Sequence, residues 1–126
     1  MRKTATLITL FTTALIGTCS AQPGSLDLGF GAAGIQLLAP STSHDVAHEV
    51  IALADTTLLT CGVAFVNGEP TAFIAHLLQD GTLDTGYGTN AGYTYFDAGQ
   101  ETYAYDMELA ADGSVYLCGT AYPTFN

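Results

Sequence analysis

The segment from His44 to Glu49, His-Asp-Val-Ala-His-Glu, holds the closest grouping of side chains that could bind a metal ion. Two histidines four residues apart lie together on a helix, where they can share one ion. The surrounding residues alternate as in a strand, and on a strand His44 and His48 would stand about 13 Å apart. Because Glu49 follows the second histidine, the helical zinc-protease motif is absent. We therefore expect structural roles for both histidines.

No other pattern in the sequence predicts catalytic or cofactor-binding residues. His76 lies within an apolar run, which favours a partly buried, hydrogen-bonded histidine over a metal ligand. Asp106 and Glu108 share one face of an expected strand, but no feature of the sequence marks them as an acid–base pair. Glycine motifs for phosphates and serine-nucleophile motifs do not occur. Weak Ca²⁺ binding by clustered carboxylates remains an alternative, although the spacing does not match a calcium-binding loop.

Four tyrosines lie at alternating positions in the second half of the chain: Tyr93, Tyr95, Tyr103 and Tyr105. Alternate positions on a strand point to the same face, so each pair can form a small aromatic surface. Such a surface could bind a sugar ring, but aromatic residues are also the usual packing residues of strands. We expect the packing role and keep glycan binding as the alternative.

The charge distribution excludes one class of partner. Arg2 and Lys3 are the two basic residues of the chain, and all 12 acidic residues follow them. A chain that begins at Gln22 therefore has no Lys, no Arg and a strongly negative surface. Such a surface repels phosphate backbones, so nucleic-acid binding is not expected. Solubility is the simplest role for this charge.

Residues 1–21 have the layout of a secretory signal peptide: a short basic start, an apolar run from Ala5 to Gly17, and small residues up to Ala21. The apolar run is shorter than the roughly 20 residues that cross a bilayer, and no later segment approaches that length. We therefore expect no transmembrane helix and predict a secreted or cell-surface protein. A lipid anchor on Cys19 is the less favoured alternative, because Thr18 does not fit the lipid-attachment pattern.

A repeat of 57 residues organises the rest of the chain. Gly24-Ser25-Leu26-Asp27 recurs as Gly81-Thr82-Leu83-Asp84, and one inserted residue brings Gly92 opposite Gly34. In each copy of the motif we expect the Leu and the following aromatic residue to fill the core, and the Asp to accept hydrogen bonds from backbone N–H groups. The defining residues are Gly24, Leu26, Asp27, Phe30, Gly31, Asp55, Cys61 and Gly62 in the first copy, and Gly81, Leu83, Asp84, Tyr87, Gly88, Asp112, Gly113, Cys118 and Gly119 in the second.

Short runs of β-branched and aromatic residues between Gly and Asp predict strands in both copies. Asp80-Gly81 and Asp112-Gly113 are expected turns, and Thr56 in the place of Gly113 indicates a turn of another type. Gly62 is expected to end its strand. The fold class is all-β, with antiparallel four-stranded units like propeller blades. The expected strands are residues 35–39, 46–53, 57–61 and 71–78, then 93–96, 103–109 and 114–118.

Cys61 and Cys118 occupy the same position in the two copies. Equivalent positions in neighbouring units usually lie farther apart than the ~7 Å between Cα atoms that a disulfide allows. We therefore expect two free, buried thiols. A disulfide between them is the alternative, since an exported chain with an even number of cysteines can form one.

These residues together resemble the delta-60 repeats of large bacterial exported proteins. That family combines a G-x-L-D-x-x-F-G turn, a following Gly, a D-G hairpin, a small residue with Gly, and an apolar strand leading into the next D-G. The resemblance implies a propeller-like β fold at the cell surface or outside the cell and brings no catalytic residues with it. His76 stands where the family often has Arg. The matching stretches are Gly24 to Gly34, Asp55, Cys61-Gly62 and Phe73 to Gly81, then Gly81 to Gly92, Asp112-Gly113 and Cys118-Gly119.

We expect three segments: a signal peptide at 1–21, a first blade at 22–80, and a second blade at 81–126 that lacks its fourth strand. Two blades leave open edges, because propellers usually close with four or more. The expected function is a non-catalytic exported module of a larger protein, used as a scaffold, adhesion or recognition surface. Its expected partners are further repeats, a second copy, or an unidentified protein or glycan. The alternative is the N-terminal part of a propeller enzyme, such as a glycan-processing one, whose active site needs further blades.

Overall fold

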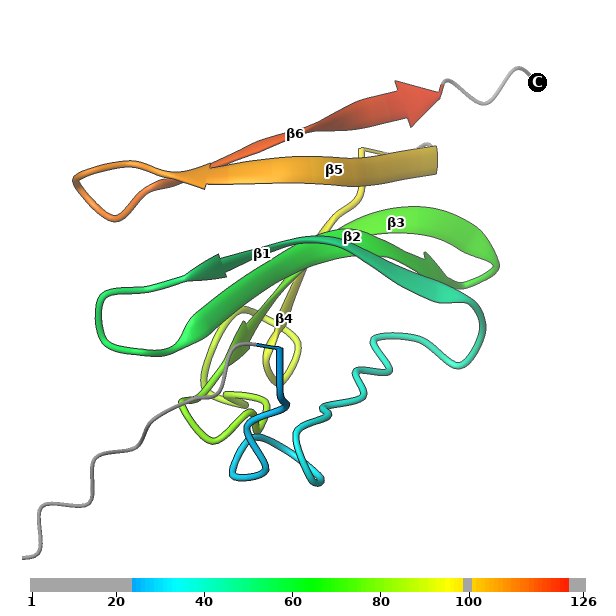
Figure 1. Cartoon of the computed structure of the whole chain (residues 1–126). Coiled ribbons are helices and arrows are strands. Elements are labelled where there is room, and N and C mark those ends of the chain that lie inside the picture. The colour runs from blue at the N-terminus through cyan, green and yellow to red at the C-terminus, as the bar shows by residue number, and fades with distance from the viewer. Residues whose placement is uncertain (1–23, 99–100, 123–126) are drawn as a thin grey trace, which may run out of the picture.

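The computed structural model describes residues 24–98 and 101–122, which form six β-strands (Figure 1). The expected all-β class is confirmed: the described residues contain no helix, and the strands pair antiparallel in sheets of four and two. The expected signal peptide, including Cys19, lies outside the described residues. The strands are β1 (Asp45–Ala52), β2 (Leu58–Val66), β3 (Glu69–Leu77), β4 (Tyr93–Phe96), β5 (Glu101–Leu109) and β6 (Val115–Tyr122).

The strands form two layers that lie face to face (Figure 1). The first sheet has the order β1-β2-β3-β4, and the second is the hairpin β5-β6. β5 lies against β1, β2 and β3, so the hairpin covers one face of the larger sheet. β4 follows the loop that begins at Gly81. A strand from the second half of the chain therefore completes the sheet formed by the first half.

A β-bulge opposite a glycine interrupts the hairpin β1–β2. Ala47 pairs with Gly62 and Glu49 pairs with Cys61, which leaves His48 as the extra residue. A Cβ atom on Gly62 would collide with the carbonyl oxygen of Val46. Glycine is required at this position because the bulged strand approaches its partner too closely for any side chain.

The hairpin β5–β6 has the same bulge 57 residues further along. Ala104 pairs with Gly119 and Asp106 pairs with Cys118, so Tyr105 is the extra residue. A Cβ atom on Gly119 would collide with the carbonyl oxygen of Tyr103. The expectation that Gly62 ends its strand is therefore wrong, because each glycine permits the bulge and its strand continues beyond it.

Residues 35–39 do not form a strand, contrary to the sequence-based expectation. β4, which holds the equivalent position in the second half of the chain, does pair with β3, from Ala72–Phe96 to Ala75–Tyr93. Residues 35–39 pair with none of the described strands; Ile35 forms an isolated bridge to Gly31. An apolar run becomes a strand only where its backbone groups find a partner strand, and sequence periodicity cannot supply that partner.

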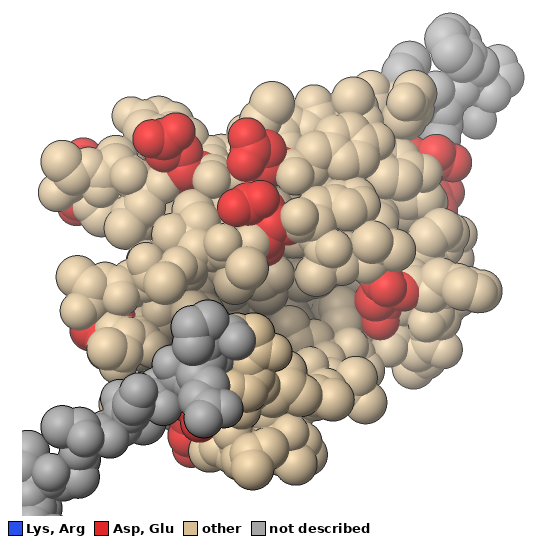
Figure 2. Space-filling model, viewed as in Figure 1, with Lys and Arg blue, Asp and Glu red and all other residues tan. Residues whose placement is uncertain are grey.

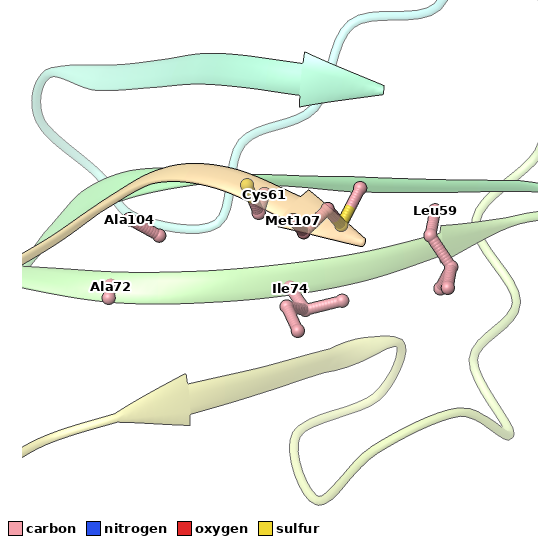
Figure 3. Packing of buried hydrophobic residues seen from close by; sticks show 6 residues of the cluster. All are labelled: Leu59, Cys61, Ala72, Ile74, Ala104 and Met107. Atoms are coloured by element: carbon pink, nitrogen blue, oxygen red, sulfur yellow. The ribbon is translucent and has the colours of Figure 1, made fainter. Parts of the chain in front are cut away.

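Buried residues form a cluster on each face of the first sheet. The cluster between the two layers joins β2 and β3 to β5 (Figure 3), and it consists of Leu59, Cys61, Ala72, Ile74, Ala104 and Met107. The cluster on the opposite face consists of Ala64, Phe73 and Ala75, with Leu38, Leu83, Tyr93 and Tyr95 packed against it. Both faces of β2 and β3 are therefore buried, which explains their almost continuous apolar sequences.

The loops before residues 35–39 and before β4 have equivalent hydrogen bonds. Asp27 Oδ1 accepts the N–H of Gly29 at 2.9 Å, and Asp84 Oδ1 accepts the N–H of Gly86 at 3.0 Å. The expected backbone-capping role of both aspartates is confirmed. Each loop folds back on itself, with Gly34 N–H bonded to Phe30 O in one and Gly92 N–H bonded to Tyr87 O in the other.

Only one of the two loop leucines that were expected in the core packs there. Leu83 forms a bridge with Leu77 and packs against the Phe73 cluster, whereas Leu26 is 60% exposed. The expectation that Leu26 fills the core is wrong: the first loop contacts the turn at Asp80 through Gly31, and Leu26 belongs to neither buried cluster. Tyr87 packs against the cluster between the layers, as expected.

Cys61 and Cys118 are both free thiols. Cys61 is fully buried between the layers, and this burial raises the pKa of its thiol. Cys118 is exposed on β6. The prediction of two buried thiols is therefore right for Cys61 and wrong for Cys118, because the hairpin β5–β6 covers the face of β2 that carries Cys61 and the matching face of β6 is open.

Replacement of Gly62 or Gly119 by Ala is expected to lower the free energy of unfolding by about 1–3 kcal/mol, because the added methyl group overlaps a backbone carbonyl oxygen. Urea unfolding measures the change. Gly86→Ala is the control: its Cβ would lie 3.3 Å from Asp84 Oδ1, and Gly86 has no positive φ. Equal stability of all three variants would contradict the close strand approach.

Candidate functional site

An open cleft of about 420 Å³ lies where the turns of the two long hairpins approach each other. Its walls come from both layers and are mainly apolar, with Asp55, His76 and Tyr87 as the polar side chains. The lining residues are Leu53, Ala54, Asp55, Leu59, His76, Tyr87, Leu109, Gly113 and Val115. We refer to this space as the inter-sheet cleft.

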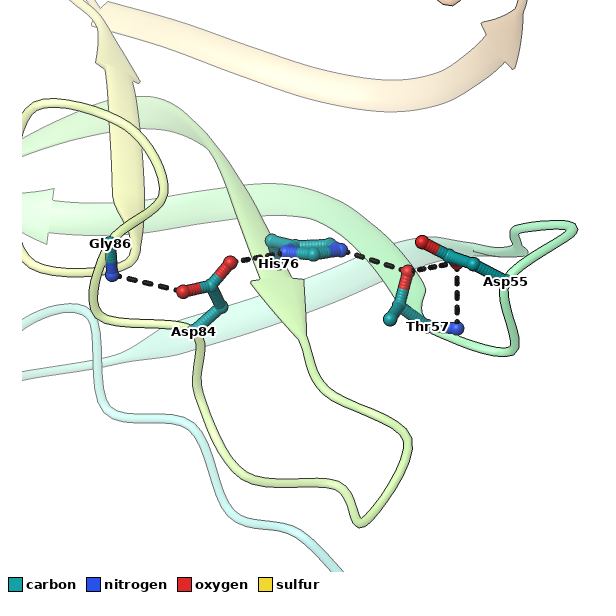
Figure 4. A network of polar contacts seen from close by, with 5 residues as sticks. All are labelled: Asp55, Thr57, His76, Asp84 and Gly86. Atoms are coloured by element: carbon teal, nitrogen blue, oxygen red, sulfur yellow. Dashed lines mark hydrogen bonds and ion pairs between the residues drawn. The ribbon is translucent and has the colours of Figure 1, made fainter.

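A chain of hydrogen bonds centred on His76 runs beside the inter-sheet cleft (Figure 4). The Nδ1 atom of His76 lies 2.9 Å from Asp84 Oδ2, and its Nε2 atom lies 2.9 Å from Thr57 Oγ1. The Thr57 hydroxyl lies 2.6 Å from Asp55 Oδ1. The other oxygen of Asp84 accepts the N–H of Gly86. The chain thus connects the turn of the β1–β2 hairpin, the end of β3 and the loop before β4.

The positions of the protons in this chain follow from the donors and acceptors available. Asp55 can only accept as a carboxylate, so the Thr57 hydroxyl donates to it. The Thr57 oxygen is then an acceptor for His76 Nε2–H, and Asp84 accepts from His76 Nδ1–H. All of these bonds form together when both ring nitrogens carry a proton. An imidazolium then lies between two carboxylates, with its side chain only 15% exposed.

Both carboxyl groups at the ends of the chain favour the ionised form. The hydrogen bond from His76, together with the N–H of Gly86, lowers the pKa of Asp84. The hydroxyl and N–H of Thr57 lower the pKa of Asp55. The chain is therefore a set of charge-assisted hydrogen bonds that is complete only while the two aspartates are ionised.

The order Thr57–His76–Asp84 resembles the hydroxyl–imidazole–carboxylate order of a hydrolase triad. A triad requires the hydroxyl to give its proton to the imidazole, which then acts as a general base. Here the Thr57 hydroxyl is directed to Asp55 at 2.6 Å. This arrangement favours a structural role, in which His76 holds the hairpin turn against the loop that contains Asp84.

The turn at Asp55 belongs to a set of three with the same bonds. Asp55, Asp80 and Asp112 each accept, on Oδ1, the N–H of the residue two positions later. Thr56 has a φ of 72°, in the same left-handed region as Gly81 and Gly113. The expectation of a different turn type at Thr56 is therefore wrong. The hydrogen bonds of the turn hold a β-branched residue in a conformation that usually favours glycine.

The other histidines lie apart from this chain. The His44 ring contacts Phe65 at a centroid distance of 6.3 Å, and His48 Nδ1 lies 2.7 Å from the carbonyl oxygen of Ala104. His48 is the bulged residue of β1, so its ring links the two layers. Among the residues that the structure describes, no three His, Cys, Asp or Glu side chains are grouped to hold a metal ion.

The exposed face of the β5–β6 hairpin carries tyrosines and carboxylates. Tyr103 and Tyr105 stack with ring centroids 6.2 Å apart. Asp106 and Glu108 line a shallow hollow of about 190 Å³ beside Tyr116. Figure 2 shows separate acidic patches and no Lys or Arg on the face viewed. Tyr93 and Tyr95 also stack, but they pack against the Phe73 cluster as expected for strand residues.

Comparison of the chain with protein-family models, curated proteins and solved structures finds no match. The site is therefore defined by the contacts of this chain's own residues. In the described part of the chain, no helix is long and apolar enough to span a membrane.

Sequence reasoning found part of the hydrogen-bonded chain. The partly buried, hydrogen-bonded His76 and the backbone-capping Asp84 were both expected, but the contact between them was not. The two residues are eight positions apart on opposite sides of a turn, so only the register of β3 with the following loop brings them together. The role of Thr57 is harder to predict from the sequence, because a threonine that follows an Asp turn usually bonds only within that turn.

Asp84→Asn is expected to lower the melting temperature by a few degrees at pH 6 and to have little effect near pH 2. The folded-state pKa of Asp84 is lowered, so its stabilising contribution is present above the unfolded value of 3.8 and is lost as the pH falls through the folded value. Calorimetry across this pH range measures the difference.

Asp106→Asn is the matched control for this substitution, because Asp106 lies on the exposed face of the hairpin. It should leave the melting temperature nearly unchanged at both pH values. A loss of stability in Asp84→Asn that is as large at pH 2 as at pH 6 would contradict the charged hydrogen bond to His76.

Proposed function

We propose that the protein is a non-catalytic, exported repeat module, built like the delta-60 repeats that its sequence resembles, and that it serves as a scaffold or recognition surface within a larger protein. One observation carries the proposal: the hairpins β1–β2 and β5–β6 pair in the same register, bulge included, 57 residues apart. Unrelated hairpins would not be expected to share the position of an extra residue, because bulge positions depend on specific local sequence.

The equivalent glycines support the same proposal. Gly31 and Gly88 both have positive φ, and an added Cβ would meet the carbonyl oxygen of Ile35 in one loop and of Tyr93 in the other. Gly34 and Gly92 both have positive φ as well. The first pair is 57 residues apart, and the second is 58 apart because of the one-residue insertion before Gly92.

The way in which the halves combine supports a modular scaffold. β4 comes from the second half and completes the first sheet, and the hairpin β5–β6 covers the buried cluster on β2 and β3. The first half therefore takes a strand from the second, and the two halves cover each other's apolar faces. Repeat proteins are stabilised in this way, by contacts between adjacent units rather than by a single central core.

The chemistry near the inter-sheet cleft supports a role without catalysis. The polar side chains that could act on a substrate, His76 and Asp84, bond to each other and to the turn around Thr57. The carboxylates elsewhere on the described surface suit an exported protein that must remain soluble among other macromolecules. The exposed tyrosines of the hairpin offer a surface for a protein or glycan partner.

The proposal predicts that the architecture can be extended by one period. Insertion of a second copy of residues 58–114 directly after Ser114 should raise the free energy of unfolding and increase the β-sheet signal in circular dichroism, because each added unit contributes one further interface. The control carries a shuffled version of the same inserted residues at the same point. If both insertions destabilised the protein equally, the repeat-module proposal would be wrong.

A further inference from the structure

The outer edge of β6 is open, whereas the equivalent edge of β2 is occupied. β2 lies between β1 and β3, and it pairs with β3 from Leu58–Leu77 to Val66–Glu69. Among the described residues β6 pairs with β5 alone. The backbone groups on the other side of β6 therefore have no partner strand in the described ranges.

The sequence of β6 does not protect this edge. Soluble proteins usually block an exposed edge with Lys, Pro, a bulge that bends it away, or a very short strand. β6 has eight residues, Val-Tyr-Leu-Cys-Gly-Thr-Ala-Tyr, with no charge and no Pro. The bulge of this hairpin lies in β5 and not in β6. An unprotected edge of this length is suited to strand addition.

The side-chain positions of β3 indicate what kind of strand fits. Phe73 stands opposite Gly62 in the β2–β3 pair and is almost completely buried. Gly119 is the equivalent of Gly62 in β6. A strand that pairs with β6 in the register of β3 would therefore place a large apolar residue opposite Gly119.

Part of the hydrogen-bond arrangement around His76 recurs in the turn between β5 and β6. His76 of β3 stands opposite Leu59 of β2. Its ring contacts the Thr57 hydroxyl, which is bonded to Asp55. Asp112 and Ser114 reproduce the bonded pair of Asp55 and Thr57, because both the backbone and the side chain of Ser114 bond to Asp112.

His76 contacts the pair of Asp55 and Thr57, whereas the described residues place no histidine beside the equivalent pair of Asp112 and Ser114. A donor carried by an added strand opposite Tyr116 would reach Ser114 as His76 reaches Thr57, and Tyr116 is the equivalent of Leu59. The carboxylates of Asp106 and Glu108, which line a hollow with Tyr116, also favour a donor or a positive charge at that place.

We propose that the open edge of β6 binds an antiparallel strand of the β3 type, supplied by a further repeat unit. The strand carries a large apolar residue opposite Gly119 and a hydrogen-bond donor, such as imidazole, opposite Tyr116. β3 of a second copy cannot serve, because β2 and β4 already occupy both of its edges. This inference rests on the proposed repeat-module function and adds the site, register and side-chain requirements of the next strand.

The test uses the full chain and a synthetic peptide with the sequence of Glu69–Leu77. We expect saturable binding by fluorescence anisotropy, and slower amide hydrogen exchange in residues 115–122 when the peptide is bound. A scrambled peptide should not bind. Peptides with Phe73→Ala or His76→Ala should bind more weakly, the second by roughly 3- to 10-fold for one lost hydrogen bond.

A double-mutant cycle gives the register. Ser114→Ala in the protein should weaken binding of the native peptide as much as His76→Ala in the peptide does, and the two changes together should cost no more than either alone. Absence of binding, protection of the β1 edge instead of β6, or additive effects would overturn the proposal. So would protection of β6 in the free protein through pairing with another β6 edge.

The outcomes separate this inference from the function on which it rests. If the inserted unit of residues 58–114 stabilises the protein but the peptide does not bind, only the strand-addition site is wrong. If the inserted unit also fails, the repeat module itself is wrong.

Discussion

The structure depends on the close approach of backbone at the two bulges. In each hairpin a glycine lies so near the carbonyl oxygen of the opposite strand that no side chain can be accommodated, at Gly62 against Val46 and at Gly119 against Tyr103. A bulge increases the local twist of a strand pair. The twisted hairpin β5–β6 packs on β2 and β3, and His48, the extra residue of the first bulge, bonds to the carbonyl of Ala104 beside the second. One local constraint, present twice, thus contributes to both the shape of the layers and the contact between them.

The hydrogen-bonded chain around His76 is the polar counterpart of this packing. It joins three segments: the turn at Asp55, the end of β3 and the loop at Asp84. The described chain has no Lys or Arg, so His76 is one of only three side chains that can carry positive charge among many carboxylates. Its ring contacts Asp84 directly and Asp55 through the Thr57 hydroxyl.

Much of the fold could be predicted from local sequence, and the failures have physical causes. The class, most strand positions, the Asp-Gly turns and the caps by Asp27 and Asp84 follow from short-range patterns. The role of Gly62 could not be predicted, because glycine marks a strand end, a bulge or a close approach equally well. The exposure of Leu26 and Cys118 and the lack of a strand at residues 35–39 depend on which neighbouring segment covers them. The link between His76 and Thr57 depends on strand register, which becomes evident only once β2 and β3 are paired.

The most direct test of this account is the pattern of cross-strand nuclear Overhauser effects in solution. The account predicts backbone contacts between Ala47 and Gly62 and between Glu49 and Cys61, and the same pair of contacts, Ala104 with Gly119 and Asp106 with Cys118, in the second hairpin. His48 and Tyr105 should each be skipped. A second hairpin that pairs without interruption through Tyr105, or in another register, would contradict the claim that the two hairpins are copies of one unit.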